Sequence, residues 1–172
     1  MDLGTNAFGQ GVAITPIQMV MAASALANNG QMVYPHVLLA EVRDGYQSDM
    51  ATHIVGNPIS AETARTITNM LHDSLQAESS TALLAGYSIA GKTGTAQIPT
   101  STGYDPDNIN ASFIGWGPIP DPRFLVYVWL EKPQSNKAAS VVAAPIFKQV
   151  IEKLVVLMGI PPDVAMTQNN GQ

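Results

Sequence analysis

Apolar residues recur every three to four positions in several stretches of the chain, which predicts amphipathic helices. The first helix is expected from Thr15 to about Asn28, because Thr15 and Gln18 have the residue types and spacing of a capping box. The second is expected from Ser60, a good N-cap residue, to about Ala77. We expect the first helix to face the core through Ile17, Val20, Met21, Leu26 and the alanines among them, and the second through Ala64, Ile67, Leu71 and Leu75.

A last helix is expected near the C-terminus. It begins at about Val142, which places Pro145 in its first turn, where proline is tolerated, and it ends at Gly159. Its pattern predicts a helix that covers one face of a sheet. The apolar residues expected along its buried side are Ile146, Val150, Ile151, Leu154 and Met158.

Between the first two helices the pattern predicts extended chain. Residues 33–42 are rich in β-branched and aromatic residues, and Arg43-Asp44-Gly45 has the composition of a turn. A return strand is expected within residues 49–57. This region therefore predicts a strand, a turn and a second strand.

Further strands are predicted at Ile89–Ile98, Ser112–Trp116 and Phe124–Leu130. The last two are expected to be antiparallel, because the proline-rich segment between them is too short for a crossover helix. Phe124–Leu130 is continuously apolar, which predicts a buried central strand. Residues 99–110 are rich in Pro, Gly, Ser, Thr, Asp and Asn, which predicts a loop.

The composition indicates a compact body that packs against further chain. Of the 172 residues, 46% are hydrophobic and only 12% are charged, whereas globular proteins typically carry about 25% charged residues. No apolar run reaches the roughly 18 residues needed to span a bilayer. The N-terminus does not have the basic and apolar regions of an export signal.

Binding of nucleic acid, a metal or a cofactor is not expected. The net charge is −5 and the 8 basic residues are scattered, whereas binding to phosphates requires grouped basic residues. The chain has no cysteine, and His36, His53 and His72 do not cluster in the sequence, so a zinc site is not predicted. Asp105 and Asp107 are interpreted as turn formers rather than metal ligands.

The segment Gly86–Gln97 has the clearest chemical meaning, and it has more than one interpretation. Gly86 to Thr93 satisfies the phosphate-loop pattern G-x-x-x-x-G-K-[S/T]. That site requires a helix that begins at Lys92-Thr93, and Gly94 and Pro99 disfavour a helix there. Nucleotide binding therefore remains only as an alternative.

In the second interpretation, Lys92-Thr93-Gly94-Thr95 is a strand that binds substrate. Lys92 supplies positive charge, and Gly94 leaves backbone that another chain can approach closely. The hydroxyls of Thr93 and Thr95 can donate to a carboxylate, and the Thr95 N–H can donate to a developing oxyanion. The same motif occurs in serine acyl-transfer enzymes that react with penicillins. A purely structural alternative is an edge strand whose exposed lysine prevents aggregation.

Five sequence blocks occur in a fixed order around this motif. They are Phe8–Gln18, Ala25–Gly30, Ala90–Gln97, Ala111–Trp116 and Ala144–Phe147. Together they resemble the C-terminal half of the transpeptidase domain of class B penicillin-binding proteins, in the penicillin-recognising serine transpeptidase and β-lactamase-like superfamily. The resemblance implies an α/β (α+β) part-domain, with an antiparallel sheet and covering helices, over residues 1–159. Residues 160–172 are expected to form a disordered tail.

In that family, a Ser-x-x-Lys motif with the nucleophile and a Ser-x-Asn motif precede the Lys-Thr-Gly-Thr strand, and neither occurs in these 172 residues. The resemblance therefore implies one part of a peptidoglycan D,D-transpeptidase that lacks the nucleophile and is inactive alone. It implies Lys92 and Thr95 as catalytic residues and a substrate-binding strand made of Thr93, Gly94, Thr95, Ala96 and Gln97. A catalytically degenerate scaffold or sensor domain is the alternative within the same family.

The resemblance also implies partners and a location. The expected partners are the N-terminal half of the same domain, peptidoglycan stem peptides ending in D-Ala-D-Ala, β-lactams and other cell-wall synthesis proteins. The expected location is the bacterial cell envelope, outside the cytoplasmic membrane, with an anchor that is not in this chain.

Overall fold

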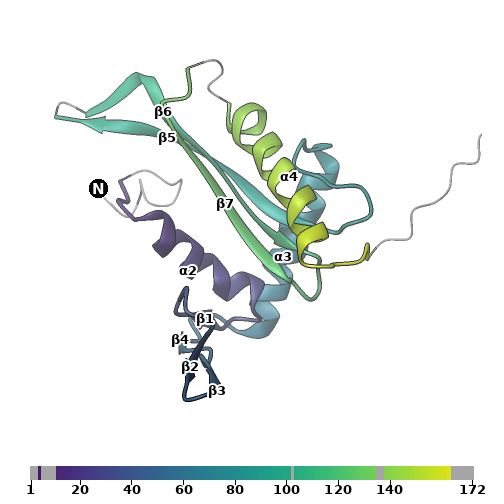
Figure 1. Ribbon diagram of the computed structural model, residues 1–172. Coiled ribbons are helices and arrows are strands. Elements are labelled where there is room, and N and C mark those ends of the chain that lie inside the picture. The colour runs from purple at the N-terminus through teal and green to yellow at the C-terminus, as the bar shows by residue number, and fades with distance from the viewer. Residues whose placement is uncertain (1–3, 5–10, 102, 135–137, 164–172) are drawn as a thin grey trace, which may run out of the picture.

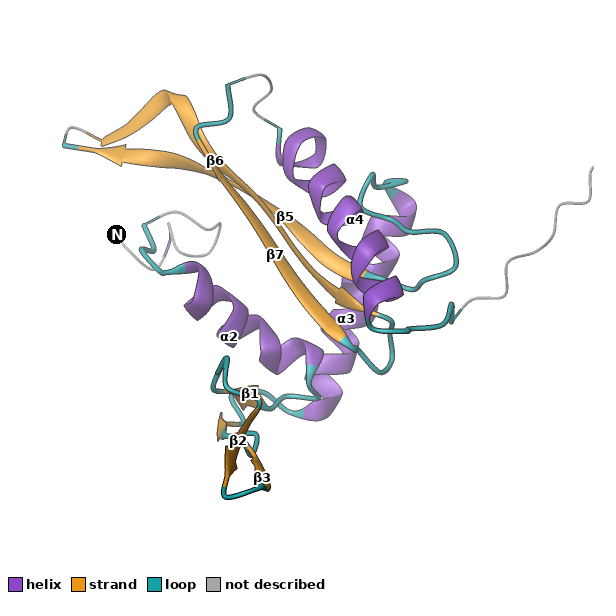
Figure 2. Ribbon diagram, in the orientation of Figure 1, coloured by secondary structure: helices purple, strands orange, loops and turns teal. Residues whose placement is uncertain are grey.

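The computed structural model describes residue 4 and residues 11–101, 103–134 and 138–163 (Figure 1, Figure 2). Its centre is an antiparallel sheet in the order β5-β6-β7, with α4 packed on all three strands, α2 against β7 and α3 against β5. Figure 1 shows α4 on one side of this sheet and α2 on the other. The predicted antiparallel sheet with covering helices is therefore confirmed. The elements are α2 (Pro16–Ala27), α3 (Ala61–Ala77), β5 (Ala90–Thr100), β6 (Gly103–Gly117), β7 (Phe124–Glu131) and α4 (Ala139–Leu157).

The start of α2 is as predicted, and its buried face is as predicted only in part, since the alanines Ala23 and Ala25 are buried but Ile17 is not. The Gln18 N–H donates to Thr15 Oγ1 at 3.3 Å, and the Thr15 N–H donates to Gln18 Oε1 at 2.8 Å, which completes the capping box. The expected core residue Ile17 is 54% exposed. The buried residues of the helix are Ala23, Ser24 and Ala25. The helix therefore packs closely through small residues near its C-terminal end, and its larger apolar residues contribute less than predicted.

Helix α3 is confirmed in its bounds and largely in its face. The Thr63 N–H donates to the Ser60 hydroxyl at 3.1 Å, as expected of an N-cap. Ala64 and Leu75 are buried as predicted. Thr68 is buried as well, and its hydroxyl donates to the carbonyl oxygen of Leu26 in α2 at 3.4 Å. This bond gives the buried Thr68 hydroxyl a hydrogen-bond partner. The apolar pattern of the sequence did not predict Thr68 as a core residue.

A small lobe lies between α2 and α3 in the sequence. The predicted turn is confirmed, with Asp44 at φ +53° and Gly45 at φ +82°. The predicted strand over residues 33–42 is wrong as a single element, because its middle is not paired. The return strand predicted within residues 49–57 is confirmed in part, because a strand at Ile54–Gly56 lies in that range and a further strand begins earlier, at Tyr46. The lobe consists of two antiparallel pairs, β1 (Met32–Val33) with β4 (Ile54–Gly56) and β2 (Ala40–Arg43) with β3 (Tyr46–Asp49).

The predicted loop over residues 99–110 is wrong. Strands β5 and β6 remain paired as far as Thr100 and Gly103, and they extend as a ribbon beyond the rest of the sheet (Figure 2). The partner on β6 changes from Ile109 to Tyr104 while β5 advances only from Gln97 to Pro99. Residues 105–108 therefore form a bulge. A bulge and an edge position are places where a strand tolerates proline, which explains why the composition was misleading.

Strand β7 was predicted to be central, and this is wrong. It pairs only with β6 among the described residues, so β6 is the central strand. Phe124 is buried, but Trp129 is 44% exposed. Apolar residues on both faces of a strand indicate burial of those faces, and they do not report whether both edges are paired.

Helix α4 covers the sheet as predicted, and its buried face overlaps the predicted one in part. Ile151 is buried and Leu154 packs on the core as expected, whereas Ile146 and Met158 are 38% and 44% exposed. It begins at Ala139, so Pro145 lies inside the helix rather than in its first turn. Phe147 and Ile151 are fully buried, whereas the expected core residue Val150 is 40% exposed. The small residues Ala139, Ala143 and Ala144 are also buried. They allow the helix to approach the strands closely and so decide which side faces the sheet.

The chain after α4 returns to the sheet. Gly159, at φ +61°, ends the helix as predicted. Ile160 is 6% exposed, and the Asp163 N–H donates to the Gly86 carbonyl oxygen at 3.0 Å. Residues 160–163 are therefore ordered against the domain, in contrast to the expected tail. The prediction for residues 164–172 lies outside the described residues.

Candidate functional site

The Lys92–Thr95 segment lies in the middle of β5, which is an edge strand of the described sheet. Its only strand partner there is β6, with Lys92 opposite Ile114 and Thr95 opposite Ala111. The other edge of β5 carries backbone groups that no described strand pairs. The predicted strand is therefore confirmed, and its role in substrate binding stays a prediction. The phosphate-loop alternative is wrong, because the chain continues as a strand where that site requires a helix.

The candidate site residues alternate between the two faces of β5. Thr93 and Thr95 lie opposite Phe113 and Ala111, which belong to the core under α4. Residues directly opposite each other in an antiparallel pair point to the same face, so Thr93, Thr95 and Gln97 lie on the face that α4 covers. Lys92, Gly94 and Ala96 lie on the other face. Because β5 is an edge strand of the described sheet, the side chains on both of its faces lie beside the edge that no described strand pairs. The predicted site residues therefore lie together along this edge.

Lys92 carries the positive charge at this edge. Its Nζ donates to Thr93 Oγ1 and to the Thr93 carbonyl oxygen, both at 3.3 Å. Lys92 and Thr95 are exposed, and Thr93 is half-buried. The ammonium group and a threonine hydroxyl therefore lie side by side, where both can contact an anionic group that approaches the strand.

Gly94 packs closely against a β6 side chain, a contact that the sequence did not reveal. A Cβ at this position would lie 2.5 Å from Oγ of Ser112, the residue opposite Gly94 on β6. Ser112 is half-buried on the same face as Lys92. Sequence reasoning missed Ser112, since only the register of two strands identifies it.

The face of the sheet that carries Lys92 has two unsatisfied polar atoms. Asn110 Oδ1 and Trp116 Nε1 are buried and have no hydrogen-bond partner within the part of the chain that the structure describes. Both residues lie on β6 at even positions, as do Ser112 and Ile114, which places them on this face. A buried polar group without a partner typically costs about 1–3 kcal/mol.

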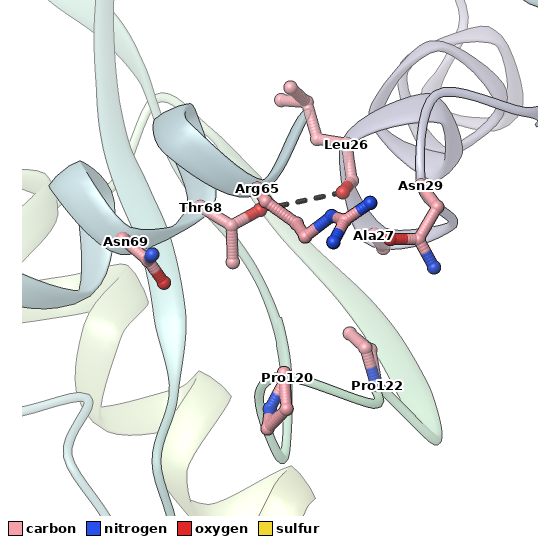
Figure 3. A pocket seen from close by; sticks show the side chains of 8 residues that line it. All are labelled: Leu26, Ala27, Asn29, Arg65, Thr68, Asn69, Pro120 and Pro122. Carbon is pink, nitrogen blue, oxygen red and sulfur yellow. Dashed lines mark hydrogen bonds between the residues drawn. The ribbon is translucent and has the colours of Figure 1, made fainter. Parts of the chain in front are cut away.

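The cavities of the described structure lie away from β5. One cavity, of about 20 Å³, lies between α2, α3 and the β6–β7 turn, where Thr68 bonds to Leu26 (Figure 3). This volume holds about one water molecule. A second cavity, of about 230 Å³, lies between α2 and the start of β7. Neither includes a β5 residue, so the described chain presents its candidate site as an open strand. The smaller cavity is lined by Leu26, Ala27, Asn29, Arg65, Thr68, Asn69, Pro120 and Pro122.

Asp105 forms the turn that the sequence predicted. Its carboxylate accepts hydrogen bonds from the N–H of Asp107 at 2.8 Å, the N–H of Asn108 at 3.1 Å and the Asn108 side-chain amide at 2.8 Å. These bonds favour the ionised form, so the pKa of Asp105 is lowered, mainly by the Asn108 side chain. The carboxylate therefore organises the bulge in β6.

The histidines make local contacts. His36 Nδ1 lies 2.8 Å from the Leu38 carbonyl oxygen, His72 Nδ1 lies 2.8 Å from that of Ile89, and the His53 ring lies 6.1 Å from the Tyr34 ring. Among the described residues, no group of three or more His, Asp or Glu side chains could hold a metal ion. In the same residues, no helix has the length and apolar character required to span a membrane.

Comparison with known proteins identifies a family that matches this geometry. The family described as the penicillin binding protein transpeptidase domain matches residues 2–152. The chain is 36% identical over 171 residues to stage V sporulation protein D of Bacillus subtilis, covering 94% of this chain and 26% of that protein. It is 28% identical over 166 residues to the peptidoglycan D,D-transpeptidase FtsI of Buchnera aphidicola, covering 95% of this chain and 28% of that protein.

A solved structure has the same fold. Penicillin binding protein 3 of Mycobacterium tuberculosis, complexed with ampicillin, superposes with a TM-score of 0.78 at 29% identity. The match covers 93% of this chain and 38% of that chain. The chain thus spans about a quarter of the length of the two curated relatives and less than half of the solved one.

Proposed function

The chain belongs to the penicillin-binding protein transpeptidase domain family, and from this premise we propose that it forms one wall of the active site of a peptidoglycan D,D-transpeptidase. The observation that carries the proposal is the unpaired edge of β5, along which Lys92, Thr93, Gly94 and Thr95 are presented. An extended peptide can add to such an edge as a further strand.

The reaction is acyl transfer through a serine. A serine hydroxyl attacks the carbonyl carbon of the D-Ala-D-Ala peptide bond, and its proton passes to the nitrogen of the departing D-Ala as the C–N bond breaks. The resulting ester is attacked by an amine of a second stem peptide, which forms the cross-link and returns the proton to the serine oxygen. A β-lactam reacts in the first step by opening its ring, and the leaving nitrogen stays attached to the acyl group.

Each residue of the strand has a role that its position supports. The hydroxyls of Thr93 and Thr95 donate to the carboxylate of the substrate or the β-lactam, and the Lys92 ammonium supports its negative charge. The Thr95 N–H donates to the oxyanion that develops in each step. Gly94 leaves space beside the substrate backbone, and Ala96 and Gln97 extend the binding strand.

The nucleophile comes from protein outside these 172 residues, because they contain no Ser-x-x-Lys or Ser-x-Asn sequence. The face of the sheet that carries Lys92 supports this division of the site. Buried polar atoms of Asn110 and Trp116 on this face have no partner among the described residues, and Trp129 on the same face is 44% exposed. A second part of the domain that covers this face would bury Trp129, whereas the Asn110 and Trp116 atoms are already buried by the described chain. The 172 residues alone are accordingly inactive.

The substrate indicates where this reaction takes place. Peptidoglycan stem peptides are cross-linked in the bacterial cell envelope, outside the cytoplasmic membrane, so we place the domain there, together with other cell-wall synthesis proteins. The ampicillin complex of the solved relative supports β-lactam binding as a property of the complete site.

The test uses the full-length protein that contains this chain. It is incubated with benzylpenicillin and analysed by intact-mass spectrometry and peptide mapping. We expect one adduct, on the serine of a Ser-x-x-Lys sequence outside residues 1–172. Thr93→Ala and Thr95→Ala should each slow acylation about tenfold, as expected for loss of a hydrogen bond to a charged group, whereas Thr66→Ala on the exposed side of α3 should not. An unmodified full-length protein would instead favour the degenerate scaffold.

A further inference from the structure

The residues that lead into β5 are held by the segment that follows α4. The Asp163 N–H donates to the Gly86 carbonyl oxygen at 3.0 Å. In return, the Ser88 N–H donates to the Asp163 carboxylate, at 3.0 Å from each of its oxygens. The main chain and the side chain of one residue thus bind both ends of the tripeptide Gly86–Ser88.

The same segment has an apolar anchor. Ile160 is 6% exposed and belongs to the hydrophobic core. Its carbonyl oxygen accepts a hydrogen bond from the Tyr87 hydroxyl at 2.9 Å. Residues 160–163 therefore form a strap, with Ile160 fixed in the core and Asp163 bound to the backbone before β5.

Two other parts of the chain also bind the lead-in to β5, which is the segment Gly86–Ile89. The Ile119 N–H, in the β6–β7 turn, donates to the Ser88 carbonyl oxygen at 3.0 Å. His72 of α3 lies with Nδ1 2.8 Å from the Ile89 carbonyl oxygen. Both backbone polar groups of Ser88 are thus hydrogen-bonded. The N–H has its partner in the strap of residues 160–163, and the carbonyl oxygen has its partner in the β6–β7 turn.

The position of this lead-in matters because β5 is paired on one side only. Lys92 follows Ser88 by four residues, about 13 Å along an extended strand. Within the described chain β5 is paired with β6 along one edge, and the hydrogen bonds of residues 86–88 constrain it further at its N-terminal end. Reactions of bound substrates are sensitive to small displacements, and a misplacement of about 1 Å can cost about 100-fold in rate.

We propose that Asp163 is a positioning residue for the Lys92–Thr95 strand: by accepting the Ser88 N–H, its carboxylate fixes the lead-in to β5 and hence the placement of the active-site wall. Asp163 itself touches neither substrate nor nucleophile. The consequence for catalysis rests on the proposed function, whereas the effect on the strand does not.

The test compares Asp163→Ala with Asp163→Asn in the full-length protein. The asparagine keeps an oxygen that can accept the Ser88 N–H, and the alanine does not. Stopped-flow measurements with a fluorescent penicillin separate the non-covalent dissociation constant from the acylation rate constant. We expect Asp163→Ala to lower the acylation rate constant about tenfold, the typical value of one hydrogen bond to a charged group, and Asp163→Asn to restore it to within about threefold.

The matched control is Glu152→Ala, which removes an exposed carboxylate from α4 and should leave acylation unchanged. Equal rates for the wild type and Asp163→Ala would overturn the proposal. A loss of rate in both Asp163 variants that follows a common fall in melting temperature would also overturn it, because the role would then be purely structural.

Hydrogen exchange tests the strand directly. Peptides that cover residues 86–95 should exchange faster in Asp163→Ala than in the wild type, while peptides from β7 should not change. Unchanged exchange across β5 would contradict the proposal whatever the acylation result. A wild-type protein that is never acylated would contradict the proposed function alone, and the exchange result would still decide the role of Asp163.

Discussion

The chemistry of this chain is concentrated in four consecutive residues, Lys92 to Thr95. Each contributes a different group to the open edge of β5: an ammonium, a hydroxyl, accessible backbone, and a second hydroxyl with its N–H. Their residue types are compatible with a substrate-binding strand, and the flanking sequence blocks favour that interpretation over a purely structural edge strand. Their supporting contacts, such as the close approach of Ser112 to Gly94, come from residues about 18 positions away in the sequence, and only the strand register identifies them.

The first prediction concerns this contact. Gly94→Ala would place a methyl group 2.5 Å from Ser112 Oγ, so the two strands or the serine must shift. We expect a loss of about 1–3 kcal/mol in the free energy of unfolding, the usual range for overpacking, together with slower acylation by β-lactams. Urea denaturation and acylation kinetics of the full-length protein measure both effects.

Ser112→Ala is the control and the rescue. Alone it should have a small effect, and in combination with Gly94→Ala it should recover most of the lost stability, because the nearest remaining atom, the Ser112 Cβ, lies 3.9 Å from the new methyl group. If the double variant is as unstable as the sum of the single variants, the contact is not the cause.

At the scale of elements, the packing of α4 on the sheet decides which of its many apolar residues form the core. Phe147 fills the space left by Gly115, where a Cβ would lie 2.7 Å from the phenylalanine ring, and its ring lies 4.6 Å from that of Phe113. Ile146 and Val150 lie outside this contact, at 38% and 40% exposure. The α4 sequence is apolar on more than one side, so its periodicity alone did not select the buried face.

The second prediction tests this assignment. Phe147→Ala should lower the free energy of unfolding by about 3–5 kcal/mol, because it leaves a cavity at a fully buried site. Ile146→Ala, at the adjacent position, should cost less than about 1 kcal/mol. Thermal or urea denaturation of the two variants compares them. Equal losses would mean that the face predicted from the sequence is the buried one after all.

The third prediction concerns the bulge of the β5–β6 hairpin. The pKa of Asp105 is lowered from its ordinary value of 3.8, mainly by the Asn108 side chain and the Asp107 N–H. Because the pKa of Asp105 is lower in the folded state than its ordinary value, the ionised carboxylate stabilises the folded state at pH values above 3.8. This stabilisation is lost as the pH falls below 3.8 through the lowered pKa of the folded state. The hairpin bulge should therefore loosen in acid.

An NMR titration of Asp105 and of the Asn108 side-chain amide provides the measurement. We expect the midpoint to lie below 3.8 in the wild type and to move back towards that value in Asn108→Ala, because the largest cause of the shift is removed. A midpoint that does not respond to Asn108→Ala would contradict the assigned cause.

At the scale of the molecule, the two sides of the described sheet are covered unequally: α4 packs on all three strands on one side, whereas on the other side α2 packs against β7 and Trp129 stays exposed. The hydrophobic core lies between the sheet and α4, with Phe113, Phe147 and Ile151 fully buried. The open edges of β5 and β7 and the exposed Trp129 lie elsewhere on the sheet. This distribution fits a chain that spans only part of the domain of its solved relatives.

The fourth prediction follows from this asymmetry. The isolated 172-residue chain should bind a dye that recognises exposed apolar surface and should form no adduct with benzylpenicillin, whereas the full-length protein should form the adduct and bind less dye. Dye fluorescence and intact-mass spectrometry measure the two properties. A β-lactam adduct on the isolated chain would show that its own residues contain a nucleophile, which contradicts the proposed division of the site.

The sequence by itself determined the features that depend on neighbours within one or two turns. The capping box of Thr15 and Gln18, the N-cap at Ser60 and the turn at Asp44-Gly45 were predictable, because their partners lie within a few residues. The ordered sequence blocks were specific enough to predict the family, and the family match confirms it.

Only the tertiary structure decided which long-range partners the elements take. It made β6 rather than β7 the central strand and extended β5 and β6 through residues that looked like a loop. It also brought Asp163 to Ser88, 75 positions earlier in the sequence. Such pairings depend on the register, packing and closure of the whole chain, and a local pattern contains no information about a partner at that distance.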